Sequence, residues 1–457
     1  MYAMTSLWFE SALLPQGWAT QVRLTAADGH IERVAAGVAA QAEDERHAIG
    51  VPGLPNVHSH AFQRGLAGLT ERRGPAHDSF WSWRELMYQF VERMDPDEFE
   101  ALSTLAYAQM LEGGFTHVGE FHYLHHDRNG VPFADPGELA GRIAAAAAHS
   151  GIGLTLLPTF YAHAGFGGTE PAPRQRRFCN DPQRFARIVE ASRKAVQGLA
   201  GARVGVAPHS LRAVTPSELA AVVELAHGGV VHIHIAEQLR EVEECLAWSG
   251  RRPVEWLLDN QDVDKRWCLV HATHATDAEL AAVAARGAVI GLCPLTEASL
   301  GDGIFPAAQF FAHKGRIAIG SDSNILLDAA EELRLLEYSQ RLAQRARNVL
   351  AAGHGASTGR SLFDAALAGG AQALYPDERS TGLAPGASLD VLSLNATHPA
   401  LIARREDEVL DSWIFAGGQP LIDCVWRAGV KLVSGGRHRD RDGIAARYGQ
   451  ALRRLLA

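Results

Sequence analysis

The sequence predicts an α/β protein: a (β/α)8 TIM-like barrel with a small β-sandwich domain built from both chain ends. Between about residues 51 and 381, short apolar strand-like runs alternate with longer helix-like segments, which is typical of a parallel sheet covered by helices. Eight such runs occur, and six end in or just before a His, Glu or Asp. The strand ends of a closed barrel meet at one mouth, whereas an open sheet would scatter them along a line, so a barrel is favoured.

The expected elements follow from these runs in chain order. We expect strands over residues 51–58, 115–121, 153–160, 203–209, 230–235, 267–271, 288–293 and 316–320. We expect helices over residues 96–112, 182–199, 216–226, 241–258, 277–286 and 329–350. Pro or Asp precedes many of these helices, as helix starts prefer.

The two flanks have a different pattern, with short alternating runs separated by Gly and Asp turns. Neither flank can bury much surface alone, so we expect both to form one small β domain. Residues 1–50 would supply its N-terminal part through runs at 7–13, 21–24 and 31–34. Residues 51–381 would form the barrel. Residues 382–457 would complete the small domain through runs at 389–394, 423–428 and 430–433, and end in a helix over 442–456.

Composition narrows the class of protein. The net charge of -9 and the pI of about 6.2 do not favour a nucleic-acid or anionic-membrane partner. The five cysteines are widely spaced and form no CxxC pair, which indicates a reducing compartment. The sequence shows no signal-peptide pattern, and no apolar run approaches the roughly 18 residues that cross a bilayer. We therefore expect a cytoplasmic protein.

The most informative motif is Val57-His58-Ser59-His60, at the end of the first barrel strand. Residues two apart on a strand point to the same side, so His58 and His60 can offer two imidazoles to one ion. A lone His is more often a packing or surface residue, but further candidates end later strands. These are His234 and Glu237 after the fifth, His271 after the sixth and Asp322 after the eighth. Together they predict a hydrolytic metal site.

Two arginines indicate the kind of substrate. Arg84 follows the first strand and Arg212 follows the fourth, and both are expected in loops at the mouth. Arg suits bidentate recognition of a carboxylate. Either one alone is more often part of a surface ion pair, but two at one mouth favour a substrate with two carboxylates. The Gly-rich loop 164–177 either covers this mouth or is a plain surface loop.

These motifs resemble the amidohydrolase superfamily, in its cytosine-deaminase-like branch, over nearly the whole chain. Longer local strings are more specific and resemble the formimidoylglutamate deiminase family. They include Asn56-Val57-His58-Ser59-His60-Ala61-Phe62-Gln63-Arg64, Glu120-Phe121-His122-Tyr123 and Leu300-Gly301-Asp302-Gly303-Ile304-Phe305-Pro306. That family hydrolyses N-formimidoyl-L-glutamate to N-formyl-L-glutamate and ammonia in histidine degradation. The resemblance therefore implies this activity, a small dicarboxylate substrate and a homodimer.

The resemblance also implies the roles of individual residues. The implied metal ligands are His58, His60, His234 and Asp322. The implied catalytic residues are Glu237, His271 and Asp322, and the implied substrate-binding residues are Gln63, Arg84, Tyr123, His209 and Arg212. Four other histidines match no ligand position and are expected to be structural: His122, His125, His126 and His232.

The number of metal ions follows from a missing lysine. Many relatives in the superfamily hold two metals bridged by a carboxylated lysine at the end of strand four. Here that strand ends Val206-Ala207-Pro208-His209, and none of the four lysines ends a strand. We therefore expect one divalent ion. Zinc is the default for these N and O ligands with an open water position, although ferrous iron or manganese accepts the same set.

Two other functions stay open at this point. One is deamination of another amidine or a nucleobase-type substrate, which predicts a flat aromatic pocket rather than paired guanidiniums. The segment after Asp322 supports keeping it, because Asn324 stands near a position where we expect a histidine. The other is a barrel retained as a non-catalytic assembly protein, which the complete ligand set and Glu237 disfavour.

Overall fold

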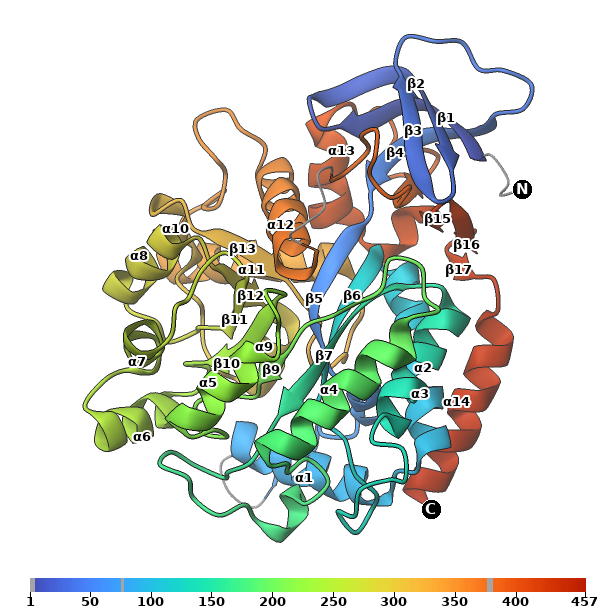
Figure 1. The fold of residues 1–457 in the computed structure, drawn as a ribbon. Helices are drawn as coiled ribbons and strands as arrows, with labels where there is room; N and C mark the ends of the chain where they lie inside the picture. The colour runs from blue at the N-terminus through green and yellow to red at the C-terminus, as the bar shows by residue number, and fades with distance from the viewer. Residues whose placement is uncertain (1–4, 75–77, 376–380) are drawn as a thin grey trace.

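The computed structural model describes residues 5–74, 78–375 and 381–457, and it contains the predicted barrel (Figure 1). Its strands are parallel and mostly buried on both faces, which explains their largely apolar sequences. In chain order they are β5 (Leu54–Ser59), β6 (Phe115–His122), β7 (Gly153–Phe160), β8 (Arg203–Val204) with β9 (Ala207–Pro208), β10 (Val231–Ile235), β11 (Trp267–His271), β12 (Val289–Leu292) and β13 (Arg316–Ile319).

Two seams close the barrel. Strands β5 to β9 form one parallel set and β10 to β13 another. A parallel bridge between Val206 and Val231 joins the sets on one side, and one between Ser59 and Asp322 joins them on the other. All strand ends therefore converge on one mouth, as the polar residues at the strand ends predict.

Helices surround the barrel, and their start signals match the sequence. Asp95 caps α2 by accepting from the backbone N–H of Glu98 at 2.8 Å, and Pro96 occupies the first helical turn. The α-helices of the barrel are α1 (Phe80–Arg93), α2 (Pro96–Glu112), α3 (Glu138–Ser150), α4 (Pro182–Val196), α5 (Pro216–Glu224), α6 (Leu239–Ser249), α7 (Pro253–Asn260), α8 (Asp277–Arg286), α9 (Pro294–Leu300), α10 (Ala307–Ala312), α11 (Ala329–Gln344) and α12 (Thr358–Leu374).

Three expected elements are interrupted in the structure. The run 51–58 covers the end of β4 (Glu45–Pro52) in the small domain and most of β5, with Gly53 between them. A side chain at Gly53 would meet Thr116 at 2.2 Å, so the chain can pass there only as glycine. The run 203–209 divides into β8 and β9, and the helix expected over 241–258 is two helices. Gly250, with a φ of 73°, ends α6, and Pro253 starts α7.

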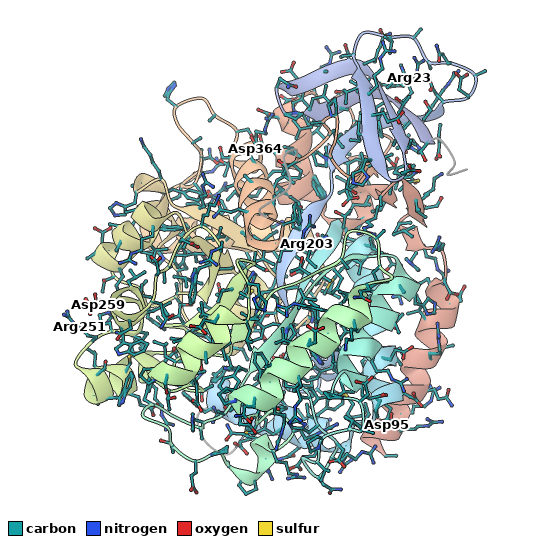
Figure 2. The ribbon with its side chains drawn as sticks, in the orientation of Figure 1. Arg23, Asp95, Arg203, Arg251, Asp259 and Asp364 are labelled. Atoms are coloured by element: carbon teal, nitrogen blue, oxygen red, sulfur yellow. The ribbon has the colours of Figure 1, made fainter. Side chains whose placement is uncertain are left out.

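Both ends of the chain build the small domain. Its single mixed sheet has the order β17-β16-β15-β14-β4-β1-β2-β3, and its two halves pack around a second apolar core that includes Phe9, Leu24 and Trp426. The remaining strands are β1 (Thr5–Leu14), β2 (Gly17–Ala27), β3 (His30–Ala35), β14 (Val391–Leu394), β15 (Ile422–Arg427), β16 (Val430–Ser434) and β17 (Arg437–His438). Arg23, labelled in Figure 2, pairs with buried Asp44 at 2.9 Å and lowers the pKa of that carboxyl to about 2.

The small domain lies at the end of the barrel opposite the mouth, next to the start of β5 (Figure 1). A short helix, α13 (Asp407–Ser412), follows β14, and the last helix, α14 (Arg441–Leu456), runs along the outside of the barrel beside α2. Arg441 pairs there with Glu112 at 3.1 Å. None of the described residues forms a helix both long and apolar enough to cross a membrane.

Close packing of α12 on the barrel gives a test of the fold. An alanine methyl at Gly369 would lie 1.8 Å from the Ile317 carbonyl oxygen of β13, so α12 would have to move away from the strand. Gly369→Ala should destabilise the protein by about 1–3 kcal/mol or more. Gly141→Ala in α3 is the matched control, because nothing lies within 4 Å of the added methyl. That change should be neutral or slightly stabilising. Equal melting temperatures for the two variants would contradict this packing.

Candidate metal centre and substrate cavity

The strands that carry the predicted site end in a sharp change of backbone direction. Ala236 after β10, His271 at the end of β11 and Asp322 after β13 have φ angles of 49°, 69° and 43°. Such left-handed residues cost about 1–3 kcal/mol each when they are not glycine, and surrounding bonds must hold them. At Ala236 the buried Glu241 carboxylate supplies two such bonds, because it accepts from the N–H groups of Ala236 and Glu237 at 3.2 and 3.1 Å. This left-handed backbone conformation directs the functional side chains into the mouth.

Four buried side chains form a compact donor cluster: His58, His60, His234 and Asp322, with their ligand atoms all within 4.8 Å of one another. Asp322 Oδ1 lies 3.3 Å from His58 Nε2 and 3.2 Å from His60 Nε2. The Nε2 atoms of His58 and His234 face each other at 3.0 Å. These are the four ligands expected from the sequence, and the fold brings all of them together.

The chemistry of the cluster fits a bound cation. The Nδ1 atoms of His60 and His234 donate to the carbonyl oxygens of Phe121 and His209 at 3.0 and 2.9 Å, so each Nε2 keeps a lone pair directed at the cluster. Burial lowers the pKa of His58 to about 3 and also lowers that of His234. Neutral imidazoles beside one carboxylate are the donor set of a divalent transition metal.

The expected catalytic pair lies beside this cluster. Glu237 is buried, and burial raises the pKa of its carboxyl group. His271 Nε2 is 3.9 Å from Asp322 Oδ2. Although burial opposes it, the charges of Glu237, Glu297 and Asp322 raise the pKa of His271 to about 10. Two groups that can exchange protons, Glu237 and His271, therefore lie beside the donor cluster, which suits proton transfer.

A cavity opens directly above the cluster, and His60, His234 and Asp322 form part of its wall. Every predicted substrate-binding residue lines it: Gln63, Arg84, Tyr123, His209 and Arg212. The amide of Gln63 donates to the Tyr123 hydroxyl at 2.8 Å. The Nε atoms of Arg84 and Arg212 are buried and have no hydrogen-bond partner among the described residues. Arg84 lies on helix α1 and not in the expected loop, so its direction is set by a rigid element.

The sequence did not single out Trp81, which organises the arginines. The Cζ atoms of Arg84, Arg212 and Arg240 lie 4.6, 5.6 and 4.6 Å from the centre of its ring. An aromatic face attracts cations, so one ring holds three guanidiniums from three elements. Residue spacing gives no signal for this cluster.

Six aromatic side chains also line the cavity: Phe80, Trp83, Tyr88, Tyr123, Tyr161 and Phe178.

The Gly-rich loop 164–177 packs against two helices of the barrel. Phe166 stacks on Trp248 of α6 with ring centres 5.5 Å apart, and Arg174 pairs with Glu85 of α1 at 3.0 Å. The loop therefore bridges α6 and α1, and the cavity lining contains none of residues 164–177.

The other singled-out histidines lie outside the cluster, in structural contacts. His232 Nε2 is 2.9 Å from the carbonyl oxygen of Ala373, beneath the site. His125 and His126 contact backbone carbonyls in the same way, and His122 is fully enclosed. Asn324, where a histidine was expected, is buried and bonds Ser59 and Ser321 at 3.2 and 2.6 Å. It does not line the cavity.

Comparisons with known proteins agree with this geometry. Residues 49–431 match the family model described as the amidohydrolase family. Residues 4–48 match the model of the N-terminal domain of formimidoylglutamate deiminase HutF. The chain is 49% identical to the formimidoylglutamate deiminase of Pseudomonas aeruginosa, over 99% of this chain and 100% of that protein. It is 28% identical to an 8-oxoguanine deaminase of the same species, over 68% of each.

Solved structures show the same architecture. An amidohydrolase from Brucella melitensis superposes with a TM-score of 0.96 and 56% identity, over 99% of this chain and 100% of that one. An adenosine deaminase from Xanthomonas campestris, crystallised with bound zinc, superposes with a TM-score of 0.82 and 23% identity, over 99% and 98% of the two chains. The barrel and the sheet from both chain ends are thus shared by all three.

The donor cluster predicts that two histidines of β10, His234 and His232, differ in their effect on metal content. His234→Ala should lose most of its bound metal, because it removes one of the four donors. His232→Gln is the matched control on the same strand, and its metal content should stay at the wild-type level. Elemental analysis of the purified proteins measures both. Unchanged metal in His234→Ala would contradict the assignment of this cluster.

Proposed function

The chain belongs to the amidohydrolase family, and we propose that it is a metal-dependent formimidoylglutamate deiminase. It hydrolyses N-formimidoyl-L-glutamate to N-formyl-L-glutamate and ammonia. The whole-length relative at 49% identity supports the activity, and the matching N-terminal model supports it independently of the barrel.

The paired guanidiniums carry the assignment of the substrate. Arg84 from α1 and Arg212 from the loop after β9 enter one cavity with their Nε atoms unpartnered among the described residues. Burial lowers the pKa of Arg212, but the charges of Glu241, Glu237 and nearby tyrosines together outweigh burial and raise it, so Arg212 remains a cation. Buried cations require anionic partners. A glutamate moiety supplies two carboxylates, one for each arginine, and leaves its formimidoyl group to approach the metal cluster.

The reaction needs a nucleophilic water and two proton transfers. His58, His60, His234 and Asp322 would hold the metal ion, which would supply the nucleophile by lowering the pKa of a bound water from about 15.7 toward 7. Glu237 takes a proton from the attacking water and passes it to the imino nitrogen of the substrate. Asp322 accepts the second proton from the hydroxyl group of the tetrahedral intermediate and delivers it to the same nitrogen. The C–N bond then breaks as the carbonyl forms, and the nitrogen leaves as ammonia. His271 orients the water. It also stabilises the negative charge that develops on the water's oxygen as that oxygen bonds to the formimidoyl carbon.

A second candidate function is deamination of a nucleobase-type substrate. The aromatic lining of the cavity favours it, and so does the relative that deaminates 8-oxoguanine. A neutral base would offer no carboxylate to the buried Nε atoms of Arg84 and Arg212, however, and an unsatisfied buried donor costs binding free energy. The dicarboxylate substrate is therefore preferred.

We propose a single zinc ion. None of the four lysines is buried, so no lysine is placed to bridge a second metal. Three imidazoles, one carboxylate and an open position suit zinc. The cytoplasmic location, the homodimer and the place in histidine degradation stay predictions of the sequence.

The substrate assignment predicts a clear order of activities. Ammonia release from formimidoylglutamate should exceed release from formimidoyl-aspartate, guanine or cytosine. Arg84→Gln and Arg212→Gln should each lower kcat/KM for formimidoylglutamate by roughly 30-fold or more, since removing one partner of a charge pair that substrate binding buries costs about 2 kcal/mol or more. Arg240→Gln is the control, because it touches Trp81 but does not line the cavity. Faster turnover of guanine or cytosine would overturn the assignment.

The role of Glu237 is tested by removing its charge alone. Glu237→Gln should keep its metal, because Glu237 is not a member of the donor cluster. Its kcat should fall by about 100-fold to 10,000-fold, the usual contribution of a general acid–base group. Glu243→Gln makes the same change at an exposed position on α6 and should leave kcat unaltered. Near-normal turnover by Glu237→Gln would refute its role.

A further inference from the structure

Glu297 is a buried carboxylate that the proposed reaction does not use. It lies in α9, directly after β12, and is 5% exposed. Its Oε1 atom is 3.2 Å from His271 Nδ1 and also accepts from the backbone N–H of Cys293 at 2.9 Å. A buried carboxylate is costly unless it is bonded, so these contacts account for its presence.

The contact with Glu297 fixes which ring nitrogen of His271 faces the cavity. The His271 ring presents Nδ1 to Glu297 and Nε2 to the cavity side, where Asp322 Oδ2 is 3.9 Å away. A carboxylate at Nδ1 accepts the hydrogen of that nitrogen in both protonation states of the ring. The remaining nitrogen then faces the reacting atoms. Carboxylates orient metal-site and catalytic histidines in this way in many enzymes.

The backbone of His271 makes such a support necessary. Its φ of 69° and that of Ala272, 50°, place two consecutive non-glycine residues in the left-handed region. The ring therefore stands on a strained turn and not on a regular strand. Glu297 is itself fixed by its bond to Cys293 N–H, so the strain and the carboxylate together define one ring position.

We propose that Glu297 is a positioning residue for hydrolysis, which fixes the rotamer and the proton arrangement of His271. The inference deepens the proposed function and rests on it, because His271 acts there on the attacking water. Glu297 touches neither the cavity nor the donor cluster, so it acts only through His271.

A purely structural role would look different, and the chain offers a matched control. Glu332 is a second buried carboxylate that supports α9, since its Oε2 accepts from the backbone N–H of Leu295 at 2.9 Å. It makes no hydrogen bond to His271 among the described contacts. Glu332→Gln therefore perturbs the start of α9 as Glu297→Gln does, without changing the partner of the catalytic ring.

A double-mutant cycle with His271 separates the two roles. We expect Glu297→Gln to lower kcat by about 10–100-fold, with KM within about threefold of wild type and with full metal content. In the His271→Asn background the same change should cost less than about twofold, because the ring that it positions is gone. Glu297→Asp, one methylene shorter, keeps the charge but withdraws the oxygen, and it should also lower kcat. Glu332→Gln should have the same effect on kcat in both backgrounds.

The outcomes that overturn the inference are distinct. They are an equal loss of kcat in both backgrounds, a loss confined to KM or metal content, or wild-type kcat in Glu297→Asp. If Glu297→Gln does not fold, the cycle is run with Glu297→Asp. Wild-type enzyme that releases no ammonia from formimidoylglutamate contradicts the proposed function instead. The cycle is then measured with whichever of guanine, cytosine or formimidoyl-aspartate the wild type hydrolyses.

Discussion

The site depends on the seam where the first and last barrel strands meet. There the backbone N–H groups of Ser321 and Asp322 donate to the carbonyl oxygen of His58 at 3.0 and 2.9 Å, and the N–H of His60 donates to Asp322 at 2.9 Å. A slip of one residue in a strand turns every side chain to its other face. The same bonds that close the barrel therefore place two histidines and the aspartate around one point. The contacts that close the barrel are therefore also the contacts that assemble the donor cluster.

The same region gathers polar groups and strained residues that do not stabilise the fold. Two imidazole Nε2 atoms face each other at 3.0 Å, and two arginine side chains bury an unpartnered Nε. Strained residues at Ala236, His271 and Asp322 add to the cost. Under the proposed function, a metal cation offsets the cost at the imidazoles and a dicarboxylate offsets the cost at the guanidiniums. Without its ligands the site therefore lowers the free energy of unfolding, as is common at active sites.

Much of this could be predicted from local sequence, because strand period and strand ends are local properties. The spacing of His58 and His60 shows that they share a face, and convergence of strand ends in a barrel brings His234 and Asp322 to them. The sequence did not reveal that Arg84 belongs to a helix, nor that the run 51–58 divides at Gly53. Both depend on tertiary contacts, such as the approach of Thr116 to Gly53, which leave no periodic signal.

Chemistry and substrate choice come from different parts of the molecule. The donor cluster and Glu237 stand on the barrel strand ends, which the amidohydrolase family shares. Arg84 stands on α1 and Arg212 on the loop after β9, and Trp81 links them through its ring. Such additions on a rigid scaffold can change without disturbing the metal. An aromatic cavity alone would suit a flat base, so the proposed choice of an amidine with two carboxylates rests on the two cations and not on the aromatic walls.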